Sequence, residues 1–377
     1  MAARRLLPPF LTRLIPIPKP RSLLSGASLS ERKTMRTTMK LAAAVGTAAA
    51  LTAALTGCTD EGSTTASADG DAVADCMPIA LEVADTLTGS AWEQALKSYI
   101  ERVQEGTDGR VMIRLLPGGQ LGGEIEMVAQ VKQGNLGLVQ AGSTGLKEFS
   151  PIFVPYLFDD AKAMDFATSE IMQGWKDAIR EREGIRVLAV EYFPPRWITS
   201  NTPIHKPADL NGLKIRVPEI PALVEAFEAF GATPVALPFP DTYYALQTGA
   251  VDGQENPPSV IESGKLQEVQ DYVAITNHAQ GFRYLLINED RFQSICESDR
   301  AVMEAEVSQL VSDQEEQLRA ESDALLDGWV SSGAVQITDL DIAEFAGAVG
   351  DAGSTEAEEA WGPGVLEQIR ELYGPNS

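Results

Sequence analysis

Beginning at Met77, short strand-like segments alternate with amphipathic helical segments, an order that few folds accommodate. Apolar and polar residues alternate in the expected strands, whereas apolar residues recur three or four positions apart in the segments between them. This order predicts an α/β fold in which helices cover the faces of a parallel sheet. In the first half, strands are expected at residues 77–85, 111–115 and 136–140, and helices at residues 92–104 and 124–133.

A second α/β half follows the first, without detectable sequence repetition between the two. Gly231 and Gly249 stand where two of its helices should end, as glycine commonly does. The expected strands are residues 186–192, 214–217, 235–237 and 284–288, and the expected helices are residues 222–230 and 242–248. The 377 residues are enough for two such units.

Residues 298–330 are rich in Glu, Gln, Ala and Leu and contain no glycine or proline before Gly328. Their apolar residues fall near one face, which predicts a helix about 45 Å long. Such a helix is longer than one small lobe and is therefore expected to run across two. The alternative is a pair of helices separated by a break that the sequence does not reveal.

The first 76 residues are expected to contain a targeting signal followed by a flexible tether. Residues 41–57 form a short apolar run that is preceded by Arg36 and Lys40 and ends in small residues, as in a secretory signal. Residues 55–58, Leu-Thr-Gly-Cys, resemble the bacterial lipobox, which implies lipidation of Cys58; an ordinary signal peptide with a chance cysteine is the alternative. Residues 1–57 are thus an upstream extension and signal, and residues 58–76 a flexible tether.

Composition excludes several functions. Lys and Arg total 30 against 54 Asp and Glu, a formal net charge of −24, so a nucleic-acid partner is not expected. Only two histidines, His205 and His278, and three cysteines, Cys58, Cys76 and Cys296, are present, in no metal-like spacing. We therefore expect neither a metal nor a cofactor.

An ordered series of motifs resembles the substrate-binding subunits of tripartite ATP-independent periplasmic (TRAP) transporters, of the dicarboxylate and organic-acid type. Any one of these glycine-rich segments alone would mean little, but the series covers essentially the whole folded part. Its members are GRV at 109–111, PGGQLGG at 117–123, VPYLF at 154–158, DLNGLKIRVPE at 209–219, GATPVALPF at 231–239, DTYYALQTGAVDGQENP at 241–257 and EVQDYVAITNH at 268–278.

The resemblance implies a two-lobed, Venus-flytrap fold with a long helix crossing both lobes. Lobe 1 is expected to comprise residues 77–193 and 282–320, and lobe 2 residues 194–281 and 321–377. Together with the lipobox-like segment, it implies a lipid-anchored monomer outside the cytoplasm, in the periplasm or on the outer face of the cell membrane. Such a protein captures a small organic carboxylate and delivers it to TRAP membrane subunits.

The resemblance also implies which residues bind the ligand. Arg216 ends an alternating strand, where α/β sheets place ligands, and its guanidinium offers two parallel donors to a carboxylate; a salt bridge to one of the many acids is the alternative. Arg196 is a second cationic contact or a hinge residue. Family members usually have a glycine before this arginine, whereas Pro194 and Pro195 precede it here and stiffen the approach. Asn256, in GQENP, contacts the ligand in the family.

Further candidates surround this set. Phe239 and Tyr243 flank Asp241, which is a possible helix N-cap, and Phe239 is either a ligand contact or a core residue. On the opposite lobe, turns that should face the cleft contain five candidates: Asp85, Trp92, Gln140, Ser143 and Thr144. His278 is expected to be structural.

Once Cys58 is lipidated, two cysteines remain in an oxidising compartment, and both of their segments belong to lobe 1 in the family. We therefore predict a disulfide between Cys76 and Cys296. No Ser-His-Asp, Gly-x-Ser-x-Gly or phosphate-loop signature is present, so no enzyme is expected. The remaining alternatives are a binding lipoprotein of an ATP-driven importer or of a sensor system, and an extracytoplasmic lyase or hydrolase.

Overall fold

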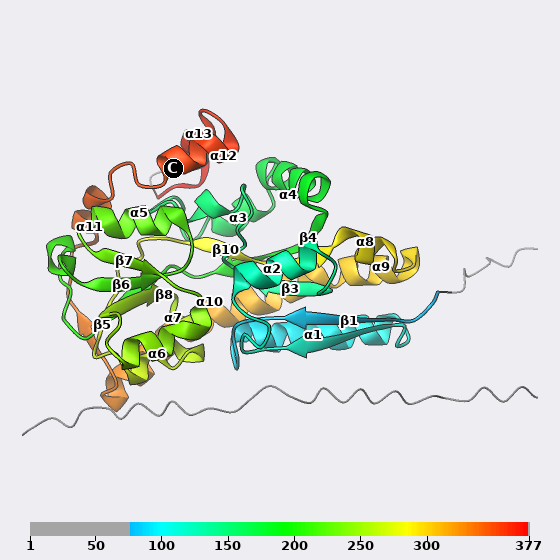
Figure 1. Ribbon diagram of the computed structural model, residues 1–377, viewed down its shortest axis with the longest axis horizontal. Coiled ribbons are helices and arrows are strands. Elements are labelled where there is room, and N and C mark those ends of the chain that lie inside the picture. The colour runs from blue at the N-terminus through cyan, green and yellow to red at the C-terminus, as the bar shows by residue number, and fades with distance from the viewer. Residues whose placement is uncertain (1–75, 376–377) are drawn as a thin grey trace, which may run out of the picture. The chain divides into compact units, whose positions relative to one another are not determined.

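The computed structural model describes residues 76–375, shown as coloured ribbon in Figure 1. The expected signal, Cys58 and nearly all of the tether lie outside these residues. Within them, no helix combines the length and the apolar composition that crossing a bilayer requires. The described chain forms two sheets, each covered by helices, which confirms the predicted α/β fold.

The first sheet has the strand order β2-β1-β3-β10-β4. Strands β1, β2 and β3 are mutually parallel, whereas β10 runs antiparallel to β3 and β4. The sheet is therefore mixed rather than purely parallel, because β10 returns from the far lobe. Its strands are β1 (Ile79–Ala84), β2 (Val111–Leu116), β3 (Leu138–Ala141), β4 (Ile185–Phe193) and β10 (Gly281–Asn288), and its helices include α1 (Ala91–Gly106), α2 (Glu124–Lys132), α3 (Ala163–Ala167) and α4 (Glu170–Glu183).

The second sheet has the order β11-β9-β5-β8-β6-β7. Strands β5, β8, β9 and β11 were not predicted. Its strands are β5 (Trp197–Ser200), β6 (Lys214–Val217), β7 (Thr233–Ala236), β8 (Gly253–Asn256), β9 (Tyr272–Ala274) and β11 (Gln336–Thr338), and its helices include α5 (Pro221–Ala229), α6 (Thr242–Gln247) and α7 (Pro258–Ser263). We call the five-stranded sheet with its helices the first lobe and the six-stranded sheet with its helices the second lobe.

Two extended connections join the lobes, one between β4 and β5 and one between β9 and β10. They are tied together, because the amide of Arg196 donates to the carbonyl of Ala279 at 2.9 Å. Strand β10 is buried along its whole length, with Leu285 and Ile287 facing α1 and α10 and the alternate residues facing the other side. Arg283 therefore stands in a strand that otherwise reads as core.

The long helix is interrupted once. In place of one helix over residues 298–330, α9 (Glu297–Ala305) and α10 (Val307–Ser332) meet at Glu306, so the two-helix alternative is the correct one. The buried hydroxyl of Tyr99 donates to the carbonyl of Met303 at 3.1 Å. A continuous helix would use that carbonyl for the amide of Val307, so the side chain inserts into the helical hydrogen-bond ladder.

Helix α10 alone has 26 residues and spans about 39 Å. It packs against α1 and β4 of the first lobe and against α7 of the second, as Figure 1 shows. The predicted crossing of both lobes is thus present in α10.

Cys76 and Cys296 form a disulfide with their Cα atoms 5.6 Å apart. The pair joins the segment just before β1 to the residue before α9, both in the first lobe. Nearby Asp299 is nearly fully buried and is paired with Arg110 at 2.8 Å. The carboxylate next to the disulfide therefore has a cationic partner of its own.

The C-terminal helices contact both lobes, although residues 321–377 were assigned to lobe 2. Helix α11 (Ile342–Ala348) packs on the second lobe, where Phe345 lies 5.4 Å from Phe230. Helix α12 (Ser354–Trp361) and helix α13 (Val365–Tyr373) instead reach the first lobe: Trp361 stacks on Trp175 and Tyr373 contacts Phe166. The exact lobe boundaries stay a prediction.

Candidate functional site

A cavity lies between the two lobes, and both contribute to its walls. The first lobe supplies the turn after β1, the start of α2, the loop after β3 and one side chain of β10. The second lobe supplies the ends of β6 and β8 and the segment after β7. Five of the eleven predicted ligand residues line this cavity: Ser143, Arg196, Arg216, Phe239 and Asn256.

Three of these residues come from neighbouring strands of the second sheet. Arg216 lies in β6, which pairs with β8, and β8 ends at Asn256. On the other side of β8, β5 begins directly after Arg196. Because adjacent strand ends bring their side chains together, this lobe presents two guanidinium groups and one amide to the same cavity.

Arg216 has no carboxylate within ion-pair distance among residues 76–375. Its Nε and Nη2 atoms both donate to the carbonyl of Leu237, at 3.0 and 2.6 Å. The side chain is only 2% exposed, and this burial lowers the pKa of Arg216 to about 10, with a partial offset from Glu255. It stays charged at neutral pH, and a buried charge of this kind favours a counter-ion in the cavity.

Arg196 differs from Arg216 because it is already paired. Its Nε and Nη2 atoms contact the carboxylate of Glu255, and Nη2 also donates to Oδ1 of Asn256 at 2.8 Å. Burial would raise the pKa of Glu255, but Arg196 and His278 outweigh it and hold that pKa below its usual range. The Arg196–Glu255 ion pair therefore has almost no net charge and leaves Arg216 as the neighbouring guanidinium without an ion pair among residues 76–375.

His278 contacts the carboxylate of Glu255 in this ion pair. It is completely buried, with Nδ1 2.7 Å from the hydroxyl of Thr276 and Nε2 3.2 Å from Glu255. Burial lowers the pKa of His278. Its contacts agree with the structural role expected for it, because it orients Glu255 and does not line the cavity.

Phe239 lines the cavity, with its ring 5.9 Å from Cζ of Arg216, whereas Asp241 and Tyr243 do not line it. Tyr243 reaches out to Glu268, at 3.5 Å. Asp241 is exposed and precedes α6, but its side chain makes no capping hydrogen bond. Its backbone is helical (φ −86°, ψ −11°), whereas a capping side chain requires an extended backbone, so the expected side-chain cap is not formed.

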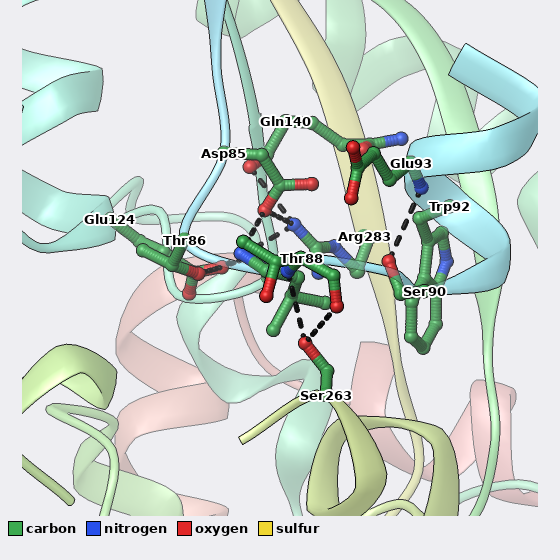
Figure 2. A network of polar contacts seen from close by, with 12 residues as sticks. Asp85, Thr86, Thr88, Ser90, Trp92, Glu93, Glu124, Gln140, Ser263 and Arg283 are labelled. Atoms are coloured by element: carbon green, nitrogen blue, oxygen red, sulfur yellow. Dashed lines mark hydrogen bonds and ion pairs between the residues drawn. The ribbon is translucent and has the colours of Figure 1, made fainter. Parts of the chain in front are cut away.

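On the first lobe, Arg283 lines the cavity and was not predicted (Figure 2). Its Nη2 donates to Oδ1 of Asp85 at 2.7 Å and to the carbonyl of Gln140 at 3.0 Å. Oε1 of Glu124 lies 3.7 Å away. Asp85 itself is fully buried behind Arg283 and does not line the cavity. The sequence feature that could have indicated Arg283 is its position as a single charged residue within the apolar segment GFRYLLIN.

Of the remaining first-lobe candidates, Trp92 and Thr144 do not line the cavity. Trp92 is buried, and Cζ of Arg283 lies 5.1 Å from its ring. The hydroxyl of Thr144 accepts from the amide of Leu146, at 3.2 Å. Only Ser143 faces the cavity, and its amide donates to Glu124 at 2.8 Å.

The side chain of Gln140 points into the first lobe, away from the cavity. Its Nε2 donates to both carboxylate oxygens of Glu191, at 3.0 and 2.8 Å. Glu191 is fully buried, and burial raises its pKa to about 7. Sequence reasoning did not single out Glu191, because it occupies a strand position that reads as part of the core.

The two lobes also contact each other directly at the rim of the cavity. The amide of Thr88 donates to the hydroxyl of Ser263 at 3.0 Å, and that hydroxyl donates to the carbonyl of Thr88 at 2.9 Å (Figure 2). Thr88 follows β1 in the first lobe, and Ser263 ends α7 in the second. This reciprocal pair therefore joins the lobes through two residues that do not line the cavity.

The glycines of PGGQLGG form a second contact between the lobes. A Cβ atom on Gly119 would lie 2.7 Å from Cγ of Pro240, and one on Gly123 would lie 3.1 Å from Cβ of Pro238. Side chains at these positions would hold the lobes apart. The motif therefore fits closely against Pro238 and Pro240 of the second lobe.

Comparisons with known proteins agree with this geometry. The model of the family described as bacterial extracellular solute-binding protein, family 7, matches residues 85–353. A solute-binding protein of Roseobacter denitrificans is 34% identical over 286 residues, which are 74% of this chain and 87% of that protein. The 2,3-diketo-L-gulonate-binding periplasmic protein YiaO of Escherichia coli is 31% identical over 265 residues, 68% of this chain and 80% of that protein.

A crystal structure of a TRAP periplasmic solute-binding protein from Roseobacter denitrificans, with bound L-galactonate, has a TM-score of 0.72 to this chain at 31% identity. The match covers 78% of this chain and 99% of that protein.

Proposed function

Because this chain belongs to family 7 of the bacterial extracellular solute-binding proteins, as a substrate-binding subunit of a TRAP transporter, we propose that Arg216 holds the carboxylate of its ligand. The family consists of transport proteins that bind small organic acids outside the cytoplasm and work with TRAP membrane subunits; it is not a family of enzymes. A role in an ATP-driven importer or a sensor system is not favoured.

One observation carries the assignment of Arg216: it is a buried guanidinium at a cavity wall that has no carboxylate partner among the described residues. A ligand carboxylate would supply the missing counter-charge and accept two hydrogen bonds. Arg196 and Asn256 would contact the same end of the ligand, and Phe239 would pack on its carbon skeleton. The ligands named for the two relatives support sugar acids as the first compounds to test.

A screen of organic acids tests this proposal. The panel contains aldonates, uronates, 2-oxo acids and four-carbon diacids, added to the purified protein during thermal unfolding. A ligand that binds only the folded state stabilises it by about 2.7 kcal/mol at 100 times its dissociation constant. We expect at least one carboxylate to raise the unfolding temperature while its uncharged amide does not. If no acid of the panel has an effect, the proposed function is wrong.

We further propose that the mature protein is a monomer anchored by lipid at Cys58. The resemblance to TRAP substrate-binding subunits supports a monomer, and the apolar run before Cys58 supports the anchor. Mass spectrometry of the membrane-extracted protein should find a diacylglyceryl group on Cys58 and no residue of 1–57. Cys58→Ser should release the protein from membranes. An unmodified N-terminus elsewhere would contradict the anchor.

A further inference from the structure

The two walls of the cavity carry arginines whose charges are balanced differently. On the second lobe, Arg216 contacts a backbone carbonyl and has no ionic partner among residues 76–375. On the first lobe, Arg283 is equally buried but is paired with Asp85 at 2.7 Å, and Glu124 lies 3.7 Å away. One wall therefore offers an unbalanced cation, and the opposite wall offers a balanced one.

On the basis of the proposed function, we infer that the site selects a hydroxylated monocarboxylate and discriminates against dicarboxylates, and that Asp85 sets this choice through Arg283. Asp85 is a positioning residue here, since it is fully buried and acts on the ligand only through the arginine in front of it.

A hydroxyl group suits the first-lobe wall, whereas a carboxylate does not. A hydroxyl can accept from Arg283 and donate to Glu124, and the hydroxyls of Thr86 and Ser143 line the same wall. A carboxylate only accepts, and it would lie beside the carboxylate of Glu124. Its loss of hydration would not be offset, because the charge of Arg283 is already balanced by Asp85.

The charge balance of the whole cavity points the same way. Its lining side chains and their direct ionic partners comprise three guanidinium groups and four carboxylates, namely Asp85, Glu124, Glu219 and Glu255. One negative charge is thus in excess before any ligand enters. A monoanion can lie against Arg216, but a second negative charge on the ligand would meet no unbalanced cation on the opposite wall.

Matched acids that differ only in the terminal group test the inference. L-Galactonate and galactarate share one carbon chain and differ in a terminal hydroxymethyl or carboxylate group, and D-erythronate and meso-tartrate form a shorter pair. By titration calorimetry, we expect the monoacid of a pair to bind at least about tenfold tighter than its diacid, which corresponds to about 1.4 kcal/mol. A diacid that binds as tightly as its monoacid would overturn the inference and leave the proposed function intact.

The variant Asp85→Asn should move this ratio. It removes the closer of the two carboxylates beside Arg283 and leaves only Glu124, at 3.7 Å, so the diacid should gain about tenfold relative to the monoacid, again about 1.4 kcal/mol. Asp299→Asn is the matched control: it removes a buried carboxylate from the Arg110 pair, away from the cavity, and should lower stability without changing the ratio. An unchanged ratio in folded Asp85→Asn would refute the role of Asp85. If that variant does not fold, the wild-type ratio of the two dissociation constants still shows whether the site prefers the monoacid. Arg283→Gln, which should weaken binding of the monoacid, then tests whether Arg283 contacts the ligand.

Discussion

Replacement of Arg216 by alanine is expected to abolish most ligand capture while leaving the protein folded. Removing one partner of a buried, hydrogen-bonded charge pair typically costs about 2–5 kcal/mol. At about 1.4 kcal/mol per decade, that is roughly 30-fold to several thousand-fold in the dissociation constant. Arg216→Lys keeps the charge but loses the two parallel donors, so it should also weaken binding clearly. Titration calorimetry with the acid found by the screen measures both effects.

Thermal unfolding of the same variants separates ligand binding from structure. Arg216 contributes two hydrogen bonds to Leu237, so Arg216→Ala should lower the unfolding temperature somewhat. Arg110→Ala is the control, because Arg110 is paired with Asp299 outside the cavity and should affect stability without affecting affinity. Wild-type affinity in Arg216→Ala would end the assignment of this residue to the ligand carboxylate.

Replacement of Glu191 by glutamine is expected to stabilise the protein at alkaline pH and to have little effect near pH 4.5. Burial raises the pKa of Glu191 from 4.5 to about 7, so between these values the folded state binds more protons than the unfolded state. The wild-type free energy of unfolding therefore falls as pH rises through this window and levels off above it. At about 1.4 kcal/mol per pKa unit, the loss amounts to about 3 kcal/mol.

Glutamine removes the ionisation but keeps the shape. Gln140 donates through Nε2 to Glu191, and its Oε1 has no hydrogen-bond partner among residues 76–375, so rotation of its amide group would let it accept from the new amide. Denaturant unfolding at pH 5 and pH 8 measures the difference between variant and wild type at each pH. We expect that difference to grow towards pH 8, and an equal difference at both values would show that Glu191 does not titrate in this window. Glu183→Gln, at an exposed ion pair, is the control.

Part of the cavity could be predicted because several of its lining residues lie in contiguous motifs. Arg216 and Asn256 end strands whose sequences read clearly, and their neighbourhood follows from sheet order. Arg283 was not predicted as a site residue because it lies in an apolar strand. Only the pairing of β10 with β3 brings it to the cavity wall. Asp85 and Gln140 were expected to face the cleft, but their side chains contact Arg283 and Glu191 and do not line the cavity.

The unpredicted strands have a similar cause. Strands β5, β8 and β9 have three or four residues each, and their partners are about 40 to 75 positions away in the chain. A strand this short carries little periodicity, so it is specified by its neighbours. The break at Glu306 likewise depends on Tyr99, which lies about 200 residues earlier. Local patterns contain no information about such contacts.

The reciprocal Thr88–Ser263 pair has a consequence for traffic through the transporter. Neither residue lines the cavity, so their hydrogen bonds are expected to favour the joined arrangement of the lobes in empty as well as in loaded molecules. A ligand then spends less of its binding free energy on closure, and apparent affinity increases with the competent fraction. The membrane subunits, however, would meet more empty molecules in the loaded shape. A stronger contact between the lobes therefore favours ligand affinity, whereas a weaker contact favours efficient delivery to the membrane subunits.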